Sequence, residues 1–270
     1  MNDMADSAAI QHACGIGVPL LRNRQYPGVA RGHPGPGLEA VLFDLDGTLL
    51  DTAPDLIHAA NALRVEQGLS ALADHAYGPV VSHGSAAMIE RGFNLSADDP
   101  RMQPLRQRFL DLYRASVSRA SRPFDGMLEL LDQIEQRGLR WGIVTNKPGW
   151  LTEPLLEDLG LARRAACLVS GDTLPCRKPD PAPVRHACEL LGLHPSRVVI
   201  LGDAMRDVDA GQRAGTATLV ALFGYICAED RPADWGADGL ISHPLDLLTW
   251  LDRHHAGAGR EAKSPHSGAA

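Results

Sequence analysis

The chain has 270 residues, of which 44% are hydrophobic and 22% charged, and its formal net charge at pH 7 is -7. This length suits one substantial core with a small inserted domain, and the absence of a basic stripe argues against nucleic-acid binding. No apolar run is long enough to span a bilayer, and the five cysteines lack the C-x-x-C spacing of a zinc site. We therefore expect a cytoplasmic protein, a monomer or homodimer, with no nucleic-acid or membrane partner.

The first predicted strand carries the most informative motif. Residues 1–38 mix arginines and prolines without a signal-peptide pattern, and we expect a disordered N-terminal extension there. The apolar run Ala40–Phe43 then predicts a buried strand that ends in Asp44-Leu45-Asp46-Gly47-Thr48. If Asp44 and Asp46 face one small volume, a divalent cation would relieve their mutual repulsion, and a nucleophile and a proton donor could share one phosphorus atom.

The segment from residue 55 to residue 122 is too long for an ordinary connection between strands. Its apolar spacing predicts amphipathic helices over Leu56–Leu63 and Leu105–Tyr113. We expect Val80–Ala86 to face the core, because a glycine between small polar side chains allows close approach to a substrate. The candidate substrate contacts are His83, Gly84 and Ser85. An equally good interpretation places Gly84 between helices, with its two neighbours as caps. For Arg91 we prefer a solvated helix arginine to a contact with a substrate carboxylate.

Polar residues follow two further predicted strands. The run Trp141–Val144 ends in Thr145 and Asn146, which offer a hydroxyl and free amides. The run Val198–Leu201 ends in Gly202 and Asp203, and another carboxylate follows at Asp207. Between them, Lys178 stands just before the proline-marked start of a helix that runs to about Leu191.

The remaining elements complete an alternation of helix and strand. Helices are predicted over Met127–Arg137, Leu151–Leu159 and Asp207–Ala214, and strands over Ala166–Val169 and Thr216–Leu222. The alternation continues to Leu251, and we expect residues 254–270 to form a disordered tail. The pattern predicts an α/β fold with a doubly wound parallel sheet. Such a sheet binds ligands beyond the carboxyl ends of its strands, where these motifs fall.

The ordered set Asp44-x-Asp46-x-Thr48, Thr145, Lys178 and Gly202-Asp203-x-x-x-Asp207 resembles the four signature motifs of the haloacid dehalogenase-like superfamily. The resemblance covers about Glu39 to Asp252. Residues 49–55, 144–148 and 178–181 are more closely similar to the phosphoglycolate phosphatase branch. Within that branch, Gly224-Tyr225-Ile226 and the segments 235–238 and 243–245 resemble the N-acetylmuramic acid 6-phosphate phosphatases, and we expect that region on the surface, away from the chemistry.

The resemblance implies an α/β core of residues 39–54 and 123–253 with an α-helical cap of residues 55–122. In its scheme, Asp44 attacks phosphorus and carries an aspartyl phosphate, while Asp46 protonates the leaving alcohol and later activates water. Phosphate-binding residues would be Thr145, Asn146 and Lys178. Mg²⁺ would be bound by the carboxylates of Asp44 and Asp203 and by the backbone carbonyl of Asp46, and Asp207 would position Lys178 or a metal-bound water.

Structural interpretations stand beside these roles. Asp46 and Asp207 could be turn or helix caps, Thr145 a strand-end hydroxyl and Lys178 a solvated surface lysine. The acid at Asp46 favours phosphoryl transfer over dehalogenation, because a halide leaving group needs no proton. We expect a Mg²⁺-dependent phosphatase acting on a small phosphate monoester, such as 2-phosphoglycolate or N-acetylmuramic acid 6-phosphate. The alternatives are a β-phosphoglucomutase-like phosphomutase and a non-catalytic phospholigand-binding protein of the same fold.

Overall fold

The computed structural model describes residues 37–255. The expected extension and tail lie outside the described residues, apart from their inner ends. Leu38 is only 1% exposed and packs in the main hydrophobic core, so the ordered core begins before residue 39. The last helix, α8 (Asp246–His255), continues past residue 253. Within residues 37–255, the helices are too short or too polar to cross a membrane.

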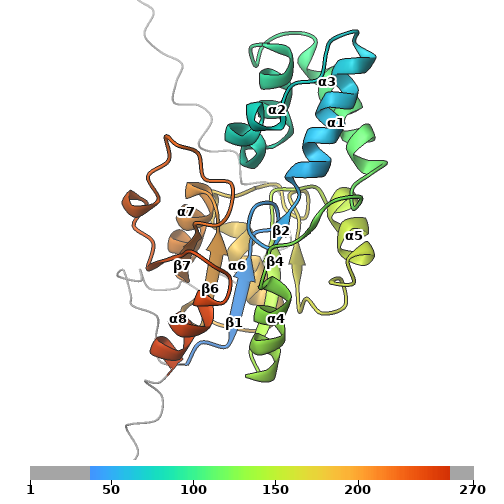
Figure 1. The fold of residues 1–270 in the computed structure, drawn as a ribbon. Helices are drawn as coiled ribbons and strands as arrows, with labels where there is room; N and C mark the ends of the chain where they lie inside the picture. Colours follow the sequence, from blue (N-terminus) through green and yellow to red (C-terminus); the bar gives the residue numbers. More distant parts are fainter. Residues whose placement is uncertain (1–36, 256–270) are drawn as a thin grey trace, which may run out of the picture. The chain divides into compact units, whose positions relative to one another are not determined.

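A six-stranded sheet forms the centre of the fold, with strand order β5-β4-β1-β6-β7-β8 (Figure 1). The central strand β1 (Ala40–Phe43) pairs in parallel with β4 (Arg140–Val144) and with β6 (Val198–Gly202). The outer strands, also parallel, are β5 (Leu168–Val169), β7 (Ala217–Ala221) and β8 (Gly239–Ile241). The chain leaves β1 for β4 on one side and reaches β6 on the other, so strand order reverses at β1, where open α/β sheets bind ligands.

Both faces of this sheet are buried, which explains why its strands are continuously apolar. Along β1, Ala40 and Leu42 belong to one hydrophobic cluster, and Val41 and Phe43 belong to the other. One cluster contains α6 (Ala182–Leu191) and α7 (Met205–Ala214), and the other contains α4 (Met127–Gln136), α5 (Gly149–Asp158) and α8. The predicted doubly wound parallel sheet is therefore confirmed.

A helical insertion lies between two short antiparallel strands, β2 (Leu50–Asp51) and β3 (Arg122–Pro123). Its helices gather beyond the carboxyl ends of the sheet strands (Figure 1). They are α1 (Ala53–Glu66), the short 3-10 helices η1 (Asp74–Ala76) and η2 (Gly78–His83), α2 (Gly84–Phe93) and α3 (Met102–Arg114). We propose to treat this insertion as the cap that the sequence predicts at residues 55–122.

Asp55 links the two chain segments that connect the cap to the core. Its buried carboxylate accepts hydrogen bonds from the backbone amides of Ala120 and Ser121 and from the Ser121 hydroxyl, at 2.7 to 3.0 Å. A residue in the first turn of α1 thus holds the segment that enters β3, 65 positions further along the chain. Hydrogen bonds to a charged acceptor are stronger than neutral ones.

Asp55→Ala is expected to lower the free energy of unfolding by about 2–3 kcal/mol, because it leaves the amide of buried Ser121 without its partner. Urea unfolding followed by circular dichroism measures the loss. Ser121→Ala is the matched control: it removes only the hydroxyl donor and should cost about 1 kcal/mol. Equal losses for the two variants would contradict the role given to the Asp55 carboxylate.

Candidate active site

A cavity of 290 Å³ lies between the cap and the carboxyl ends of β1 and β4. From the core it is lined by Asp44, Asp46, Thr145 and Asn146, and from the cap by the segment His83-Gly84-Ser85. Its size is near the lower end of the range typical of small-molecule sites. The structure therefore brings the candidate residues of two strand tips and of the cap to one cavity.

Three buried carboxylates meet beside this cavity. Asp44, Asp203 and Asp207 each offer an oxygen, and these oxygens lie within 4.8 Å of one another. Lys178 is their counter-charge: its Nζ lies 2.8 Å from Asp44 Oδ1 and 2.6 Å from Asp207 Oδ1, and it donates to the Val144 carbonyl at 2.6 Å. The Lys178 side chain is fully buried, so the interpretation as a solvated surface lysine is wrong.

The cluster suits a hard divalent cation. Asp203 Oδ2 accepts from the Tyr225 amide at 3.0 Å and from Ser82 Oγ at 2.9 Å, whereas its buried Oδ1 has no partner among the described residues. Burial, with the charges of Asp44 and Asp207 beside it, raises the pKa of Asp203 to about 7. Carboxylate oxygens are ligands that Mg²⁺ prefers, and a cation would relieve this repulsion.

Asp207 combines two of the interpretations that its sequence position allowed. Its Oδ2 accepts from the Ala204 amide at 3.1 Å, as a helix cap does, and its Oδ1 pairs with Lys178. This hydrogen bond at the start of the helix explains why α7 begins at Met205, two residues earlier than predicted. Both Asp207 oxygens are thus engaged, which leaves Asp44 and Asp203 as the carboxylates best placed to contact a cation.

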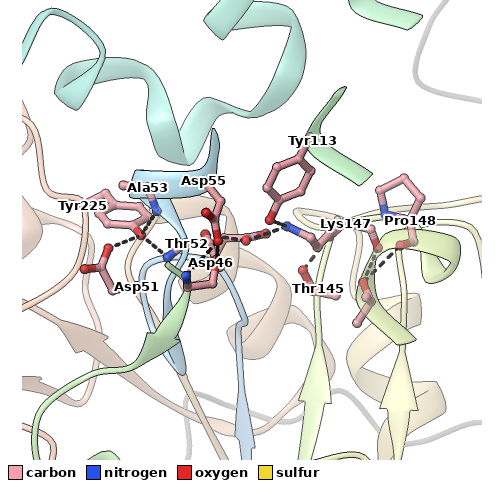
Figure 2. A network of polar contacts seen from close by, with 12 residues as sticks. Asp46, Asp51, Thr52, Ala53, Asp55, Tyr113, Thr145, Lys147, Pro148 and Tyr225 are labelled. Carbon is pink, nitrogen blue, oxygen red and sulfur yellow. Dashed lines mark hydrogen bonds and ion pairs between the residues drawn. The ribbon is translucent and has the colours of Figure 1, made fainter. Parts of the chain in front are cut away.

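Asp46 is held through one of its two oxygens (Figure 2). Its Oδ1 accepts from Thr52 Oγ1 at 2.6 Å and from Lys147 Nζ at 2.8 Å. Lys147 also donates to the Tyr113 hydroxyl in the cap at 2.7 Å, and burial raises the pKa of Tyr113 to about 12. Asp46 Oδ2 has no hydrogen-bond partner within residues 37–255, so this oxygen is free to exchange a proton with a bound molecule.

Thr145 and Asn146 differ in what their side chains can offer. Thr145 Oγ1 accepts from the Lys147 amide at 3.1 Å, and its hydroxyl hydrogen remains free to donate into the cavity. The Asn146 side chain bonds the backbone of Lys178 twice, at 2.9 and 3.0 Å. It therefore positions the lysine, and the group of Asn146 that remains for a phosphate is its backbone amide.

Arg206 lines the cavity and was absent from the sequence prediction. It makes no hydrogen bond or ion pair with another described residue, although the charges of Asp207, Asp44 and Asp203 raise its pKa against the opposing effect of burial. An unpaired guanidinium beside a cavity is a ready partner for an anion. The signal in the sequence was its place inside the Gly202-Asp203-x-x-x-Asp207 motif.

Tyr225 corrects an expectation, because the segment around it lies on the site and not away from it (Figure 2). Its hydroxyl accepts from the amides of Thr52 and Ala53 at 2.6 and 2.7 Å and donates to Asp51 at 2.9 Å. Its own amide donates to Asp203. One residue thus joins the start of the cap to the carboxylate cluster.

Close packing around Tyr225 also explains a glycine of the first motif. Gly47 has φ +84°, and an added Cβ would collide with the carboxylate of Asp203 and with the Tyr225 ring. Only glycine combines this left-handed conformation with such an approach. By contrast, Gly84 in the cap has φ +82° with open space around it, so there the conformation alone favours glycine.

Comparison with known proteins agrees with this geometry. The family model described as haloacid dehalogenase-like hydrolase matches residues 41–221. The chain is 50% identical over 216 residues to the N-acetylmuramic acid 6-phosphate phosphatase of Pseudomonas aeruginosa, covering 80% of this chain and 96% of that protein. It is 43% identical over 204 residues to the phosphoglycolate phosphatase of Xylella fastidiosa, covering 76% and 89%.

A solved structure gives the same result for the fold. The crystal structure of a predicted phosphoglycolate phosphatase from Haemophilus somnus superposes with a TM-score of 0.71 at 25% identity, over 79% of this chain and 98% of that one. Motif order, sheet topology and relatives agree. The chain therefore belongs to the haloacid dehalogenase-like hydrolase family, in its phosphoglycolate phosphatase branch.

Proposed function

We propose that this hydrolase is a Mg²⁺-dependent phosphatase of a small phosphorylated metabolite, and that it works through an aspartyl phosphate on Asp44. The observation that carries the proposal is the pair of acids on the cavity floor. Asp44 is a buried carboxylate held by Lys178, and Asp46 keeps one oxygen free. This pair provides the nucleophile and the proton donor that hydrolysis in two displacements requires.

In the first step, Asp44 attacks phosphorus and the substrate alcohol leaves. Because Oδ1 of Asp46 is occupied by Thr52 and Lys147, we assign the transferred proton to Oδ2. In the second step the same oxygen takes a proton from water, which displaces Asp44 and releases phosphate. Lys147 and Tyr113 keep Asp46 in place throughout and act as positioning residues.

The phosphoryl oxygens need donors and positive charge. Thr145 offers its hydroxyl, Asn146 its backbone amide and Arg206 its unpaired guanidinium. Lys178 Nζ donates hydrogen bonds to Asp44 and to the Val144 carbonyl and forms an ion pair with Asp207. Its positive charge acts on the phosphoryl group from this position, and a direct hydrogen bond to phosphate would compete with these contacts.

Mg²⁺, when bound, neutralises charge on the carboxylates and on the phosphate. Asp44 and Asp203 would hold it, with the backbone carbonyl of Asp46 as a third ligand. Asp203 Oδ1 is the group that most directly supports this assignment, because it is buried without a partner.

Millimolar Mg²⁺ is expected to raise the melting temperature by a few degrees, and EDTA to reverse the shift. Saturation at about 100 times Kd corresponds to about 2.7 kcal/mol. Thermal melts of the wild type and of Asp203→Asn measure the effect, which the variant should lose. Asp125→Asn is the control, because Asp125 is an exposed carboxylate that does not belong to the cluster and should keep the shift. A full Mg²⁺ shift in Asp203→Asn would refute the metal assignment.

The names of the relatives supply two candidate substrates, N-acetylmuramic acid 6-phosphate and 2-phosphoglycolate. The test is a phosphate-release screen with millimolar Mg²⁺ across phosphorylated metabolites that include both. Release from a small monoester supports the proposal. Phosphate transferred between sugar positions would favour the phosphomutase, and no reaction with any monoester would favour the non-catalytic phospholigand-binding protein.

A further inference from the structure

One wall of the cavity carries a cation that the phosphatase chemistry does not use. The cap contributes mostly apolar or neutral residues to the lining, among them Val81, Phe109 and Leu110. Arg106, on α3, is the exception. It is half-buried and is the only arginine or lysine that the described cap brings to this cavity.

Arg106 is fixed in place but its charge is not neutralised. Its Nε donates to Ser85 Oγ at 2.8 Å, and no carboxylate within residues 37–255 lies within ion-pair distance of its guanidinium. Two other cap arginines are engaged elsewhere. Arg108, two residues along the same helix, pairs with Glu66 at 2.7 Å, and Arg91 is exposed and donates to the Ala76 carbonyl. The preferred interpretation of Arg91 as a surface arginine thus agrees with its position.

The two ends of the cavity therefore differ in chemistry. At the core end, Asp44 and Asp46 stand with Arg206 and suit a phosphoryl group. At the cap end, Arg106 lines the cavity with its Nε bonded to Ser85, and its two terminal nitrogens have no hydrogen-bond partner within residues 37–255. That fork matches a carboxylate with two parallel hydrogen bonds. A molecule whose phosphate lies on Asp44 extends away from the sheet and meets the cap.

We propose that Arg106, oriented by Ser85, is a carboxylate-binding subsite, and that the substrates are phosphate monoesters that carry a carboxylate remote from phosphorus. This deepens the proposed function and rests on it for the position of the phosphate. A carboxylate is favoured over a second phosphate because Arg106 is the one arginine or lysine that the described cap brings to the cavity, whereas the core end gathers several charged groups. The subsite lies away from the reacting atoms, so it selects substrate and does no chemistry.

The kinetic test uses substrates matched in pairs. N-acetylmuramic acid 6-phosphate is compared with N-acetylglucosamine 6-phosphate, which lacks the lactyl carboxylate, and 2-phosphoglycolate with 2-hydroxyethyl phosphate. The wild type should prefer the carboxylate member of at least one pair. Arg106→Gln should lower kcat/KM for that member by roughly 10- to 100-fold, mainly through KM, and change the neutral member by less than about twofold.

Three further variants sharpen the comparison. Arg106→Lys keeps the charge but not the fork, and should recover only part of the preference. Arg108→Gln removes a charge from the same helix outside the cavity, and should leave both members of each pair unchanged. Arg177 also lines the cavity, from the core. If Arg177→Gln abolished the preference for the carboxylate substrate and Arg106→Gln did not, the assignment would be overturned. It would also be overturned if Arg106→Gln lowered kcat/KM equally for the carboxylate and the neutral member of each pair.

A binding measurement separates this proposal from the proposed function. Calorimetry with Mg²⁺ and 2-phosphoglycolate, N-acetylmuramic acid 6-phosphate or inorganic phosphate is performed on Asp44→Asn protein, with and without Arg106→Gln. The second substitution should weaken at least one carboxylate ligand roughly tenfold or more and leave inorganic phosphate unchanged. If the wild type hydrolyses no monoester, the phosphatase proposal fails, yet the calorimetric comparison still tests the carboxylate subsite. Equal affinities for the carboxylate ligands with and without Arg106→Gln would reject the subsite.

Discussion

Asp44→Asn is expected to reduce turnover by at least about 10⁴-fold, since the substitution removes the nucleophile and leaves no second route to an enzyme-bound phosphate. The protein should still fold. Asparagine has nearly the same shape as aspartate, and losing one of three clustered carboxylates relieves repulsion with Asp203. Steady-state phosphate release measures the loss, and a thermal melt verifies the fold.

Two controls make the Asp44 result specific. Asp125→Asn makes the same chemical change at an exposed position and should retain wild-type turnover. Incubation of the wild type with substrate, followed by rapid acid quench and mass spectrometry, should reveal a phosphorylated peptide containing Asp44, which the variant lacks. Turnover near the wild-type rate in Asp44→Asn would show that another group attacks phosphorus.

Asp46→Asn is expected to slow release of an alkyl alcohol by about 10² to 10⁴-fold, the usual contribution of general acid-base catalysis. The amide oxygen can still accept from Thr52 and Lys147, so position is preserved and proton donation is lost. The effect on formation of the aspartyl phosphate should shrink with p-nitrophenyl phosphate, because its leaving group needs little protonation. Single-turnover kinetics with both substrates measure this contrast.

Thr52→Val offers a milder comparison for Asp46. It removes one hydrogen bond to Oδ1 and keeps the acid, so its loss of rate should be much smaller than that of Asp46→Asn. If Asp46→Asn slowed bond breaking to a similar extent for alkyl and aryl substrates, the assignment of Asp46 as proton donor would be contradicted. Such a result would indicate an effect on the position of the reacting groups or on substrate binding.

The sequence predicted what local patterns encode. The apolar strand runs and the polar residues directly after them, at Asp44, Thr145 and Asp203, were enough to place the sheet and one edge of it. Helix ends were less exact where a distant residue decides them. The prediction began α5 at Leu151, but the helix begins at Gly149, where Asp172 accepts from the first amide. No local pattern carries that contact.

The sequence prediction missed residues of the site for the same reason, because their contacts are with residues far away in the sequence. Tyr225 contacts Thr52 across 173 positions of sequence, and Lys147 reaches Asp46 across 101. Asn146 and Lys147 are adjacent, so the motif alone could not tell which side chain reaches Asp46 and which holds Lys178. In the cap, Arg91 and Arg106 both lie on helices, and packing alone decides that Arg106 lines the cavity.

The hydrogen bond from Ser82 in the cap to Asp203 in the core has a thermodynamic consequence. If the cap moves outward to free the product, this bond breaks and Asp203 Oδ2 loses one of its two donors. By reciprocity, an ion that favours the bonded arrangement also favours the closed cap, by the same free energy. If Mg²⁺ binding and the closed cap favour each other in this way, a compound held beneath the cap would weaken Mg²⁺ binding from a position outside the proposed metal site.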